Sequence, residues 1–336
     1  MKIAFHQGKV GFYSRWIAYC IEKGIPYKTV NCYDSDIITQ LNDCDALMWH
    51  HYQTNPADLL LAKPILFSLQ QAGKIEFQDF FTNWPFDDKL GQKYLLEALG
   101  APLVKSYSFF NKQEALKWAE KSDYPLVFKL RGGAGSANVK LIHSFRDAKG
   151  IISKAFGRGF SNFDALENLK EALRKKSMHK GSWYSILEGM ARLIKPPRFA
   201  RTLGREYGYV YFQEFISGND FDIRVIVIGD KAFAIKRMIR PGDFRASGSG
   251  MILYDKKNFS ENTIKLAFDI AERLKTQAVA FDFVYKHGNP LILEISYAFV
   301  KEGYDDCVGY WDKRMNWHEG PFNPYGWMID NLLNNA

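Results

Sequence analysis

Two carboxylates flank a short turn, KHGNP, that joins two strand-like segments. Asp282 lies in VAFDFVY and Glu294 in LILEIS. In a hairpin symmetric about Gly288 they face each other directly, with Cβ atoms about 5 Å apart. Their neighbours are mostly large and apolar, so the two charges repel unless something neutralises them. Mg²⁺ can do so, because it takes one or two carboxylates together with substrate phosphate oxygens. A different register, or pairing with Lys or Arg from another strand, is the alternative.

A glycine-rich loop lies in FKLRGGAGSANVKLI, residues 128–142. A P-loop carries its Lys inside the loop, whereas Lys129 precedes these glycines. A dinucleotide fingerprint runs directly into a helix, whereas this loop runs into apolar and β-branched residues. The pattern therefore predicts a strand–loop–strand lid, in which glycines let backbone N–H groups approach phosphate oxygens.

A basic segment, KRMIRPGDFRASGSG, forms the third candidate cluster. The segment leaves a predicted strand and contains Lys236, Arg237, Arg240 and Arg245, and its glycines and serines suit a loop that approaches a ligand. Cations here could neutralise a phosphoryl group during transfer. An ordinary basic surface loop is the alternative.

The elements that must position these residues alternate in the first part of the chain. Residues 1–83 switch between short apolar runs and helical patterns, which predicts a small parallel α/β sheet. DDKLGQKYLLEALG predicts an amphipathic helix that ends at Gly100. ENTIKLAFDIAERLKTQ has apolar residues at positions 264, 267, 268, 271 and 274, which predicts one buried helical face.

Length and composition favour a folded protein of two or three subdomains, with 336 residues of which 47% are hydrophobic. No run is long enough to cross a membrane, and the N-terminus reads as a first strand rather than a signal peptide. The cysteines form no CxxC pair, so a zinc site is not expected. We expect them to be reduced thiols in the cytoplasm. They are Cys20, Cys32, Cys44 and Cys307.

The net charge of +8 is concentrated in residues 151–210, which hold 12 Lys or Arg against 5 Asp or Glu. Such a block suggests an anionic partner: a nucleotide, a phosphorylated sugar, a membrane surface or nucleic acid. A solvated basic helix without a partner is the alternative. No nucleic-acid motif is present, so nucleic acid is not expected.

The order of these motifs resembles the ATP-grasp superfamily from about residue 84 to 300. It looks most like the branch of ribosomal-protein glutamate ligases and glutathione synthetases. DDKLGQKYLLEALGAPLVKSYSF, YPLVFKLRGGAGSANVKLI, YFQEFI, DIRVIVIGDKAFAIKR, PGDFRASGSG and the pair FDFVY and LILEIS carry the resemblance. FxxNWPFDDK and the basic stretch also look like uncharacterised ATP-grasp proteins associated with surface polysaccharides.

The resemblance implies an α/β N-terminal domain, residues 1–84, followed by an α+β ATP-grasp fold whose two subdomains clasp ATP. The small subdomain would span residues 85–210, with a basic helical insertion at about 151–208. The large subdomain would span residues 211–336, with the metal site and a C-terminal cap.

The resemblance also implies roles for single residues. Arg237 and Arg245 would be catalytic, and Asp282, Glu294 and Ser296 would hold Mg²⁺ or Mn²⁺. Asp222 would meet the ribose of ATP, with Asp220 as the fallback. The other nucleotide contacts would be Lys89, Lys129, Gly132, Gly133, Gly135, Ser136, Gln213, Glu214, Phe215 and Ile216. Ser296 and Ser247 stand where the family usually has Asn.

The implied function is an ATP-dependent carboxylate–amine ligase that works through an acyl phosphate. Its substrates would be a small carboxylate and an amine, and an anionic sugar or nucleotide-sugar is one candidate. An ATP-grasp phosphotransferase and a non-catalytic ATP-binding protein are the alternatives. The first domain should form one wall of the acceptor site. The alternative is that its candidate contacts are ordinary surface residues. These candidates are His6, Lys9, Tyr13, Arg15, His50 and His51.

Overall fold

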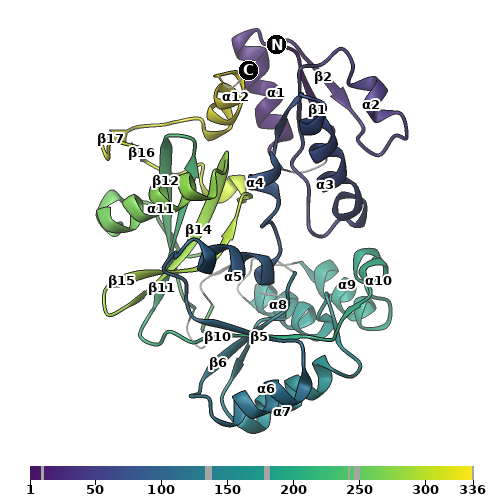
Figure 1. The fold of residues 1–336 in the computed structure, drawn as a ribbon, viewed down its shortest axis with the longest axis vertical. Helices are drawn as coiled ribbons and strands as arrows, with labels where there is room; N and C mark the ends of the chain where they lie inside the picture. The colour runs from purple at the N-terminus through teal and green to yellow at the C-terminus, as the bar shows by residue number, and fades with distance from the viewer. Residues whose placement is uncertain (9–10, 133–137, 178–181, 241–242, 246–249, 335–336) are drawn as a thin grey trace. The chain divides into compact units, whose positions relative to one another are not determined.

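The computed structural model describes residues 1–8, 11–132, 138–177, 182–240, 243–245 and 250–334. The chain folds into two compact units (Figure 1). Unit 1 comprises Met1–Leu103 and Ile216–Ala336, and unit 2 comprises Val104–Phe215.

The first sheet of unit 1 has four parallel strands in the order β2-β1-β3-β4. Parallel strands need helical crossovers, and all four residues of β1 are buried, as expected for a sheet covered on both faces. The parallel α/β sheet predicted from residues 1–83 is confirmed. Its elements are β1 (Ile3–His6), α1 (Tyr13–Lys23), β2 (Tyr27–Val30), α2 (Ile37–Gln40), β3 (Ala46–Met48), α3 (Pro56–Gln71), β4 (Ile75–Phe77) and α4 (Phe80–Asn83).

The second sheet of unit 1 is antiparallel, in the order β15-β14-β11-β12-β16-β17, with β13 also paired to β12. Its strands are β11 (Phe221–Ile228), β12 (Lys231–Met238), β13 (Ile252–Leu253), β14 (Ala278–Lys286), β15 (Asn289–Ser296), β16 (Gly309–Asp312) and β17 (Trp317–Glu319). The helices of this part are α5 (Lys89–Ala98), α11 (Glu261–Leu274) and α12 (Pro324–Asn334).

Alternate residues of β11 enter two different cores, because successive side chains of a strand point to opposite faces. Ile226 and Ile228 pack in the core that holds α1 and α12. Val225 and Val227 pack in the core that holds α11 and Leu96 of α5. The helical face predicted for α11 is the buried one. Helix α5 ends at Ala98, two residues before the predicted Gly100, which follows the cap residue Leu99 with a positive φ of 61°.

Unit 2 is built on a sheet in the order β5-β10-β6-β7. Its central strand is β10 (Val210–Glu214), which pairs with β5 (Ser106–Phe109) and β6 (Leu126–Lys129), while β7 (Lys140–Ile142) pairs with β6. Helices α6 (Lys112–Glu120) and α7 (Phe145–Ala155) contribute Ala115, Ala119 and Ile152 to the core that holds this sheet.

These units depart from the domain boundaries expected from the sequence at two places. Helix α5 packs with unit 1 and not with the small subdomain, because Leu96 joins the core under α11. Strand β10 belongs to unit 2 and not to the large subdomain, because it is hydrogen-bonded on both sides within the small sheet.

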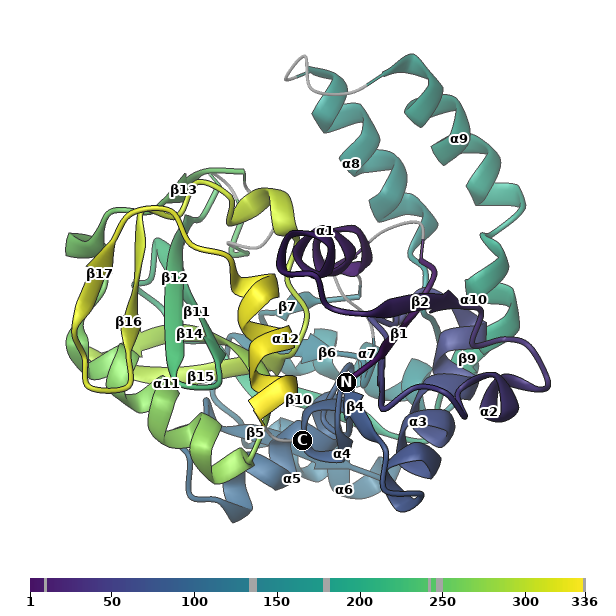
Figure 2. The same cartoon turned by 90° about the horizontal axis from the view of Figure 1, so that it is seen from above.

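The basic insertion folds as a helical hairpin. Helices α8 (Ala165–Ser177) and α9 (Trp183–Ile194) lie side by side, and α10 (Arg198–Leu203) follows (Figure 2). Two short strands, β8 (Phe160–Ser161) and β9 (Arg205–Glu206), pair at the base of the hairpin. Within the described ranges, every helix is too short or too polar to cross a membrane.

Candidate functional site

Asp282 and Glu294 lie opposite each other on β14 and β15, as the spacing predicts. The symmetry behind that prediction is wrong in detail. The strands join through a two-residue turn, His287–Gly288, in which both residues have positive φ, so the hairpin is not centred on Gly288. Leu293 is an extra residue, a β-bulge, and it shifts the register by one so that the two acids still meet.

Two arginines neutralise Asp282. Arg224 lies directly opposite it on β11, and its Nη1 donates to both carboxylate oxygens, at 2.9 and 3.0 Å. Arg237 on β12 lies 3.0 Å from the same carboxylate through Nη2. Burial acts to raise the pKa of Asp282, but the two guanidinium groups outweigh it and hold that pKa below its ordinary value. Asp282 is therefore a buried, ionised carboxylate.

Arg237 is held mainly by Asp222, its partner across β11 and β12. Its Nε and Nη2 donate to the two oxygens of Asp222, at 2.7 and 2.6 Å. Asp222 is 5% exposed, so its position favours holding Arg237 over contacting a ribose. The ribose contact expected of Asp222 stays a prediction, and the fallback residue Asp220 is the exposed carboxylate of this segment.

Glu294 is the accessible member of the acidic pair. Its side chain is 33% exposed, and one oxygen lies 3.5 Å from Nζ of Lys89, whose side chain is 7% exposed. The acidic–basic cluster, defined here as Asp222, Asp282, Glu294, Arg224, Arg237 and Lys89, thus balances three negative charges with three positive ones.

Ser296, the third predicted metal ligand, is engaged with the backbone. Its hydroxyl accepts from the N–H of Ala298 at 3.1 Å, and Arg224 donates to the carbonyl of the same Ala298 at 2.9 Å. The serine thus stabilises the turn that follows β15. In the described part of the chain, no group of three or more His, Cys, Asp or Glu side chains is arranged to hold a metal.

Other predicted residues are only partly described. Arg245 pairs with Asp243, Nε to Oδ1 at 2.9 Å. Gly132 is described at the start of the glycine loop. Gly133, Gly135, Ser136, Ser247 and Lys9 lie outside the described residues.

The predicted nucleotide residues of unit 2 meet on β6 and β10. Lys129 pairs with Tyr211, and Gln213 is two residues further along the same face of β10. Nζ of Lys129 donates to Oε1 of Gln213 at 2.7 Å, and the amide of Gln213 donates to Oγ of Ser106 at 3.1 Å. This chain of hydrogen bonds holds the buried lysine in one position.

The next residues, Glu214, Phe215 and Ile216, lead out of β10 and across the boundary between the units. The carboxylate of Glu214 accepts from Tyr107 at 3.2 Å, and its backbone N–H donates to the carbonyl of Lys105. This segment, predicted to contact the nucleotide, is therefore anchored at its first residue.

The histidines considered as acceptor contacts belong to the core of the first domain. Nδ1 of His6 accepts from the N–H of Cys32, and Nδ1 of His50 accepts from the N–H of Phe12. His51 is hydrogen-bonded to Asn83, and burial lowers the pKa of His51 to about 4. All three rings are buried in this structure. Of the other candidates, Tyr13 packs against the same core and Arg15 pairs with Asp305 at the surface.

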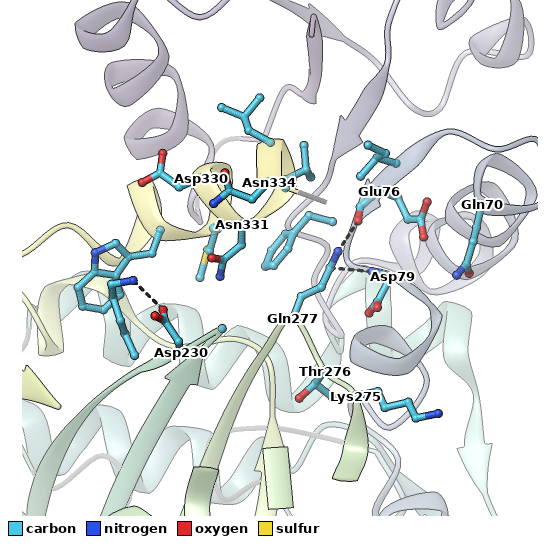
Figure 3. Close-up of a pocket in the computed structure, with 18 of the residues that line it drawn as sticks. Gln70, Glu76, Asp79, Asp230, Lys275, Thr276, Gln277, Asp330, Asn331 and Asn334 are labelled. Carbon is cyan, nitrogen blue, oxygen red and sulfur yellow. Dashed lines mark hydrogen bonds and ion pairs between the residues drawn. The ribbon is translucent and has the colours of Figure 1, made fainter. Parts of the chain in front are cut away.

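A cavity of about 980 Å³ lies in unit 1 beside β4, α12 and the turn between β11 and β12 (Figure 3). Gln277, which lines it, precedes β14 and is five residues from Asp282, roughly 17 Å along a strand. The cavity and the acidic–basic cluster therefore lie at different ends of the sheet. The lining of the cavity includes Glu76, whose Oε2 is buried without a hydrogen-bond partner among the described residues. Burial raises the pKa of Glu76 to about 7.

Comparison with known sequences finds one family. Residues 201–309 match the sequence model of the RimK-like ATP-grasp domain. That segment contains the Arg224, Asp282 and Glu294 positions described above. No curated protein matches the chain.

Comparison with solved structures covers nearly the whole chain. D-alanine–D-alanine ligase from Bacillus anthracis, complexed with ATP, is similar over 99% of this chain and 96% of its own, with 13% identity and a TM-score of 0.54. A RimK domain ATP-grasp protein from Sphaerobacter thermophilus is similar over 99% and 100%, with 15% identity and a TM-score of 0.57. The ATP-grasp ligase PsnB, complexed with minimal precursor, Mg and ADP, is similar over 99% and 97%, with 13% identity and a TM-score of 0.56. These likenesses show the fold.

Proposed function

Because the chain has the ATP-grasp fold and carries a RimK-like ATP-grasp domain at residues 201–309, we propose that it is an ATP-dependent carboxylate–amine ligase. ATP would phosphorylate a carboxylate, and an amine would then attack the acyl phosphate, which releases phosphate and forms an amide. The observation that carries the proposal is the Asp282–Glu294 pair, set beside Arg224 and Arg237.

The acidic pair fits Mg²⁺ that arrives with a nucleotide. Asp282 and Glu294 offer hard oxygen ligands on one face of a hairpin, and Glu294 is partly exposed. Asp282 and Glu294 would hold the ion, whose positive charge would neutralise negative charge that develops during phosphoryl transfer. Because the cluster is already balanced in charge, metal alone gains little there, whereas MgATP brings its own negative charge. Metal binding should therefore depend on the nucleotide.

The cations have separate roles in this proposal. Arg237 is aligned by Asp222 and would steady the transferring phosphoryl group, with Arg245 as a second cation. Lys129, held by Gln213, would contact the nucleotide. Lys89 would hold Glu294 in place until MgATP binds, and then contact the nucleotide itself.

The test is a trap for the acyl phosphate. The protein is incubated with MgATP, hydroxylamine and a pool of carboxylates that includes peptides and uronic-acid sugars. ADP and hydroxamate appearing together are the expected result, and fractionating the pool then identifies the acid. ADP with a stable phosphorylated product and no hydroxamate would instead indicate a phosphotransferase.

A second candidate is a non-catalytic ATP-binding protein. It is favoured by Ser296, whose hydroxyl is used by the backbone of Ala298 where the family usually has Asn. Tight binding of ATP with no ADP formed in the presence of any fraction of the pool would support it.

A further inference from the structure

The α8–α9 hairpin leaves large apolar side chains in solvent. On α9, Ile186 and Gly189 are the buried residues, and a Cβ added at Gly189 would lie 3.1 Å from Cδ1 of Leu169 on α8. The glycine therefore allows the two helices to pack closely. This contact uses only one side of α9.

Another side of α9 carries a second apolar stripe. Trp183, Leu187, Met190 and Ile194 are spaced four, three and four residues apart, so they share one side of the helix. Their exposed fractions are 69%, 64%, 53% and 91%. Two residues that share one face of α8, Leu166 and Leu173, are also exposed. Exposed apolar groups gathered in this way mark an interaction surface.

The same hairpin is strongly basic. Residues 165–194 hold six Lys or Arg against three Asp or Glu, and residues 195–205, which follow α9, add four more Lys or Arg and no acid. Among the exposed cations are Lys170 on α8 and Lys195 directly after α9. Nζ of Lys176 lies 5.1 Å from the centroid of the Trp183 ring, so a positive charge stands beside the apolar stripe.

We propose that the α8–α9 hairpin binds the surface of an anionic lipid bilayer. An interfacial helix buries an apolar face among the acyl chains near the headgroups, with Lys and Arg contacting anionic lipid and Trp or Tyr at the boundary. Trp183 and Tyr184 begin α9, and the stripe continues to Ile194. A nucleic-acid surface would not need this stripe, because phosphate contacts are made by polar and cationic groups.

The test is co-flotation of the full chain with vesicles of phosphatidylcholine alone, or of phosphatidylcholine with 30% phosphatidylglycerol. We expect binding to the anionic vesicles, weakened by salt, and little binding to the neutral ones. Leu187→Gln/Ile194→Gln should weaken binding by roughly tenfold or more, since both exposed side chains would enter the bilayer. The matched control is Ile21→Gln/Leu60→Gln, which removes two exposed apolar groups from unit 1, 65% and 70% exposed.

The charge is tested with Lys170→Glu/Lys195→Glu, expected to weaken binding by roughly tenfold or more. Its control is Lys121→Glu/Lys149→Glu, which reverses two exposed charges elsewhere in unit 2. Absence of binding to anionic vesicles, or equal binding by hairpin and control variants, would overturn the proposal. A wild-type dimer in solution that Leu187→Gln/Ile194→Gln converts to a monomer, without vesicle binding, would assign the stripe to a second copy of this chain.

Discussion

Arg224 lies directly opposite Asp282 across β11 and β14, and its Nη1 donates to both carboxylate oxygens. Its Nη2 donates to the carbonyl of Ala298, in the turn that Ser296 also holds. One buried guanidinium thus connects the acidic pair to the turn after β15. The arginine is two residues after Asp222, so both point to the same face of β11.

The first prediction concerns the cost of breaking this buried pair. Arg224→Met should lower the free energy of unfolding by about 3 kcal/mol, because the Asp282 charge loses one of its two arginines. The double variant Arg224→Met/Asp282→Leu should lose less free energy of unfolding than the two single variants lose together. Urea unfolding of the four proteins measures the coupling. Additive losses would show that the two side chains do not stabilise each other.

This cluster contains one contact that the sequence predicts and one that it does not. The opposition of Asp282 and Glu294 could be predicted, because the two strands are joined by a short turn and their spacing is local. Arg224 was missed, because its place beside Asp282 depends on pairing between strands 58 residues apart. The signal that could have found it is the alternation in DIR, which puts Asp222 and Arg224 on one face.

Elements with strong local periodicity were also predictable, as α11 shows with its apolar face at Ile264, Ala267 and Leu274. Long-range partners were not. The segment YVYFQEFI has no local signal which predicts that β10 pairs on both sides with strands of unit 2. His50 and His51 follow a strand, as an acceptor contact would, yet burial and packing against aromatic rings make them core residues.

The second prediction separates catalysis from folding at the acidic pair. Glu294→Gln should lower the rate of ADP formation by roughly a hundredfold or more, because a metal carboxylate is lost. The melting temperature should change little, since Glu294 is partly exposed and its contact with Lys89 is long. The control, Glu272→Gln, removes an exposed glutamate that pairs with Lys313 at 3.0 Å. Full activity of Glu294→Gln would show that the metal assignment is wrong.

The third prediction concerns the nucleotide lysine of unit 2. Gln213→Leu removes the oxygen that accepts from Nζ of Lys129, so the lysine loses a contact that orients it. The Kd for ATP should rise roughly tenfold, as expected for one charged hydrogen-bonding group that is no longer held in place. Calorimetric titration with a non-hydrolysable ATP analogue measures this, and Gln113→Leu, at an exposed position of α6, is the control. An unchanged Kd would show that the hydrogen bond from Gln213 does not position Lys129 for nucleotide binding.

The last prediction uses the buried glutamate of the cavity. Burial raises the pKa of Glu76 from 4.5 to about 7, with Asp79 adding to the effect. The folded protein therefore keeps a proton that the unfolded chain releases. As pH rises from 4.5 to 7, the free energy of unfolding should fall by about 3 kcal/mol from this group and then level off.

Glu76→Gln should remove that part of the pH dependence. The variant should be more stable than the wild type at pH 8 and similar to it near pH 4.5, because a neutral amide resembles the protonated acid. Urea unfolding at both pH values measures the difference, and Glu261→Gln, at a position whose side chain is 75% exposed, is the control. Equal pH profiles for Glu76→Gln and the wild type would mean that Glu76 is ionised in the fold, with its charge compensated within the cavity.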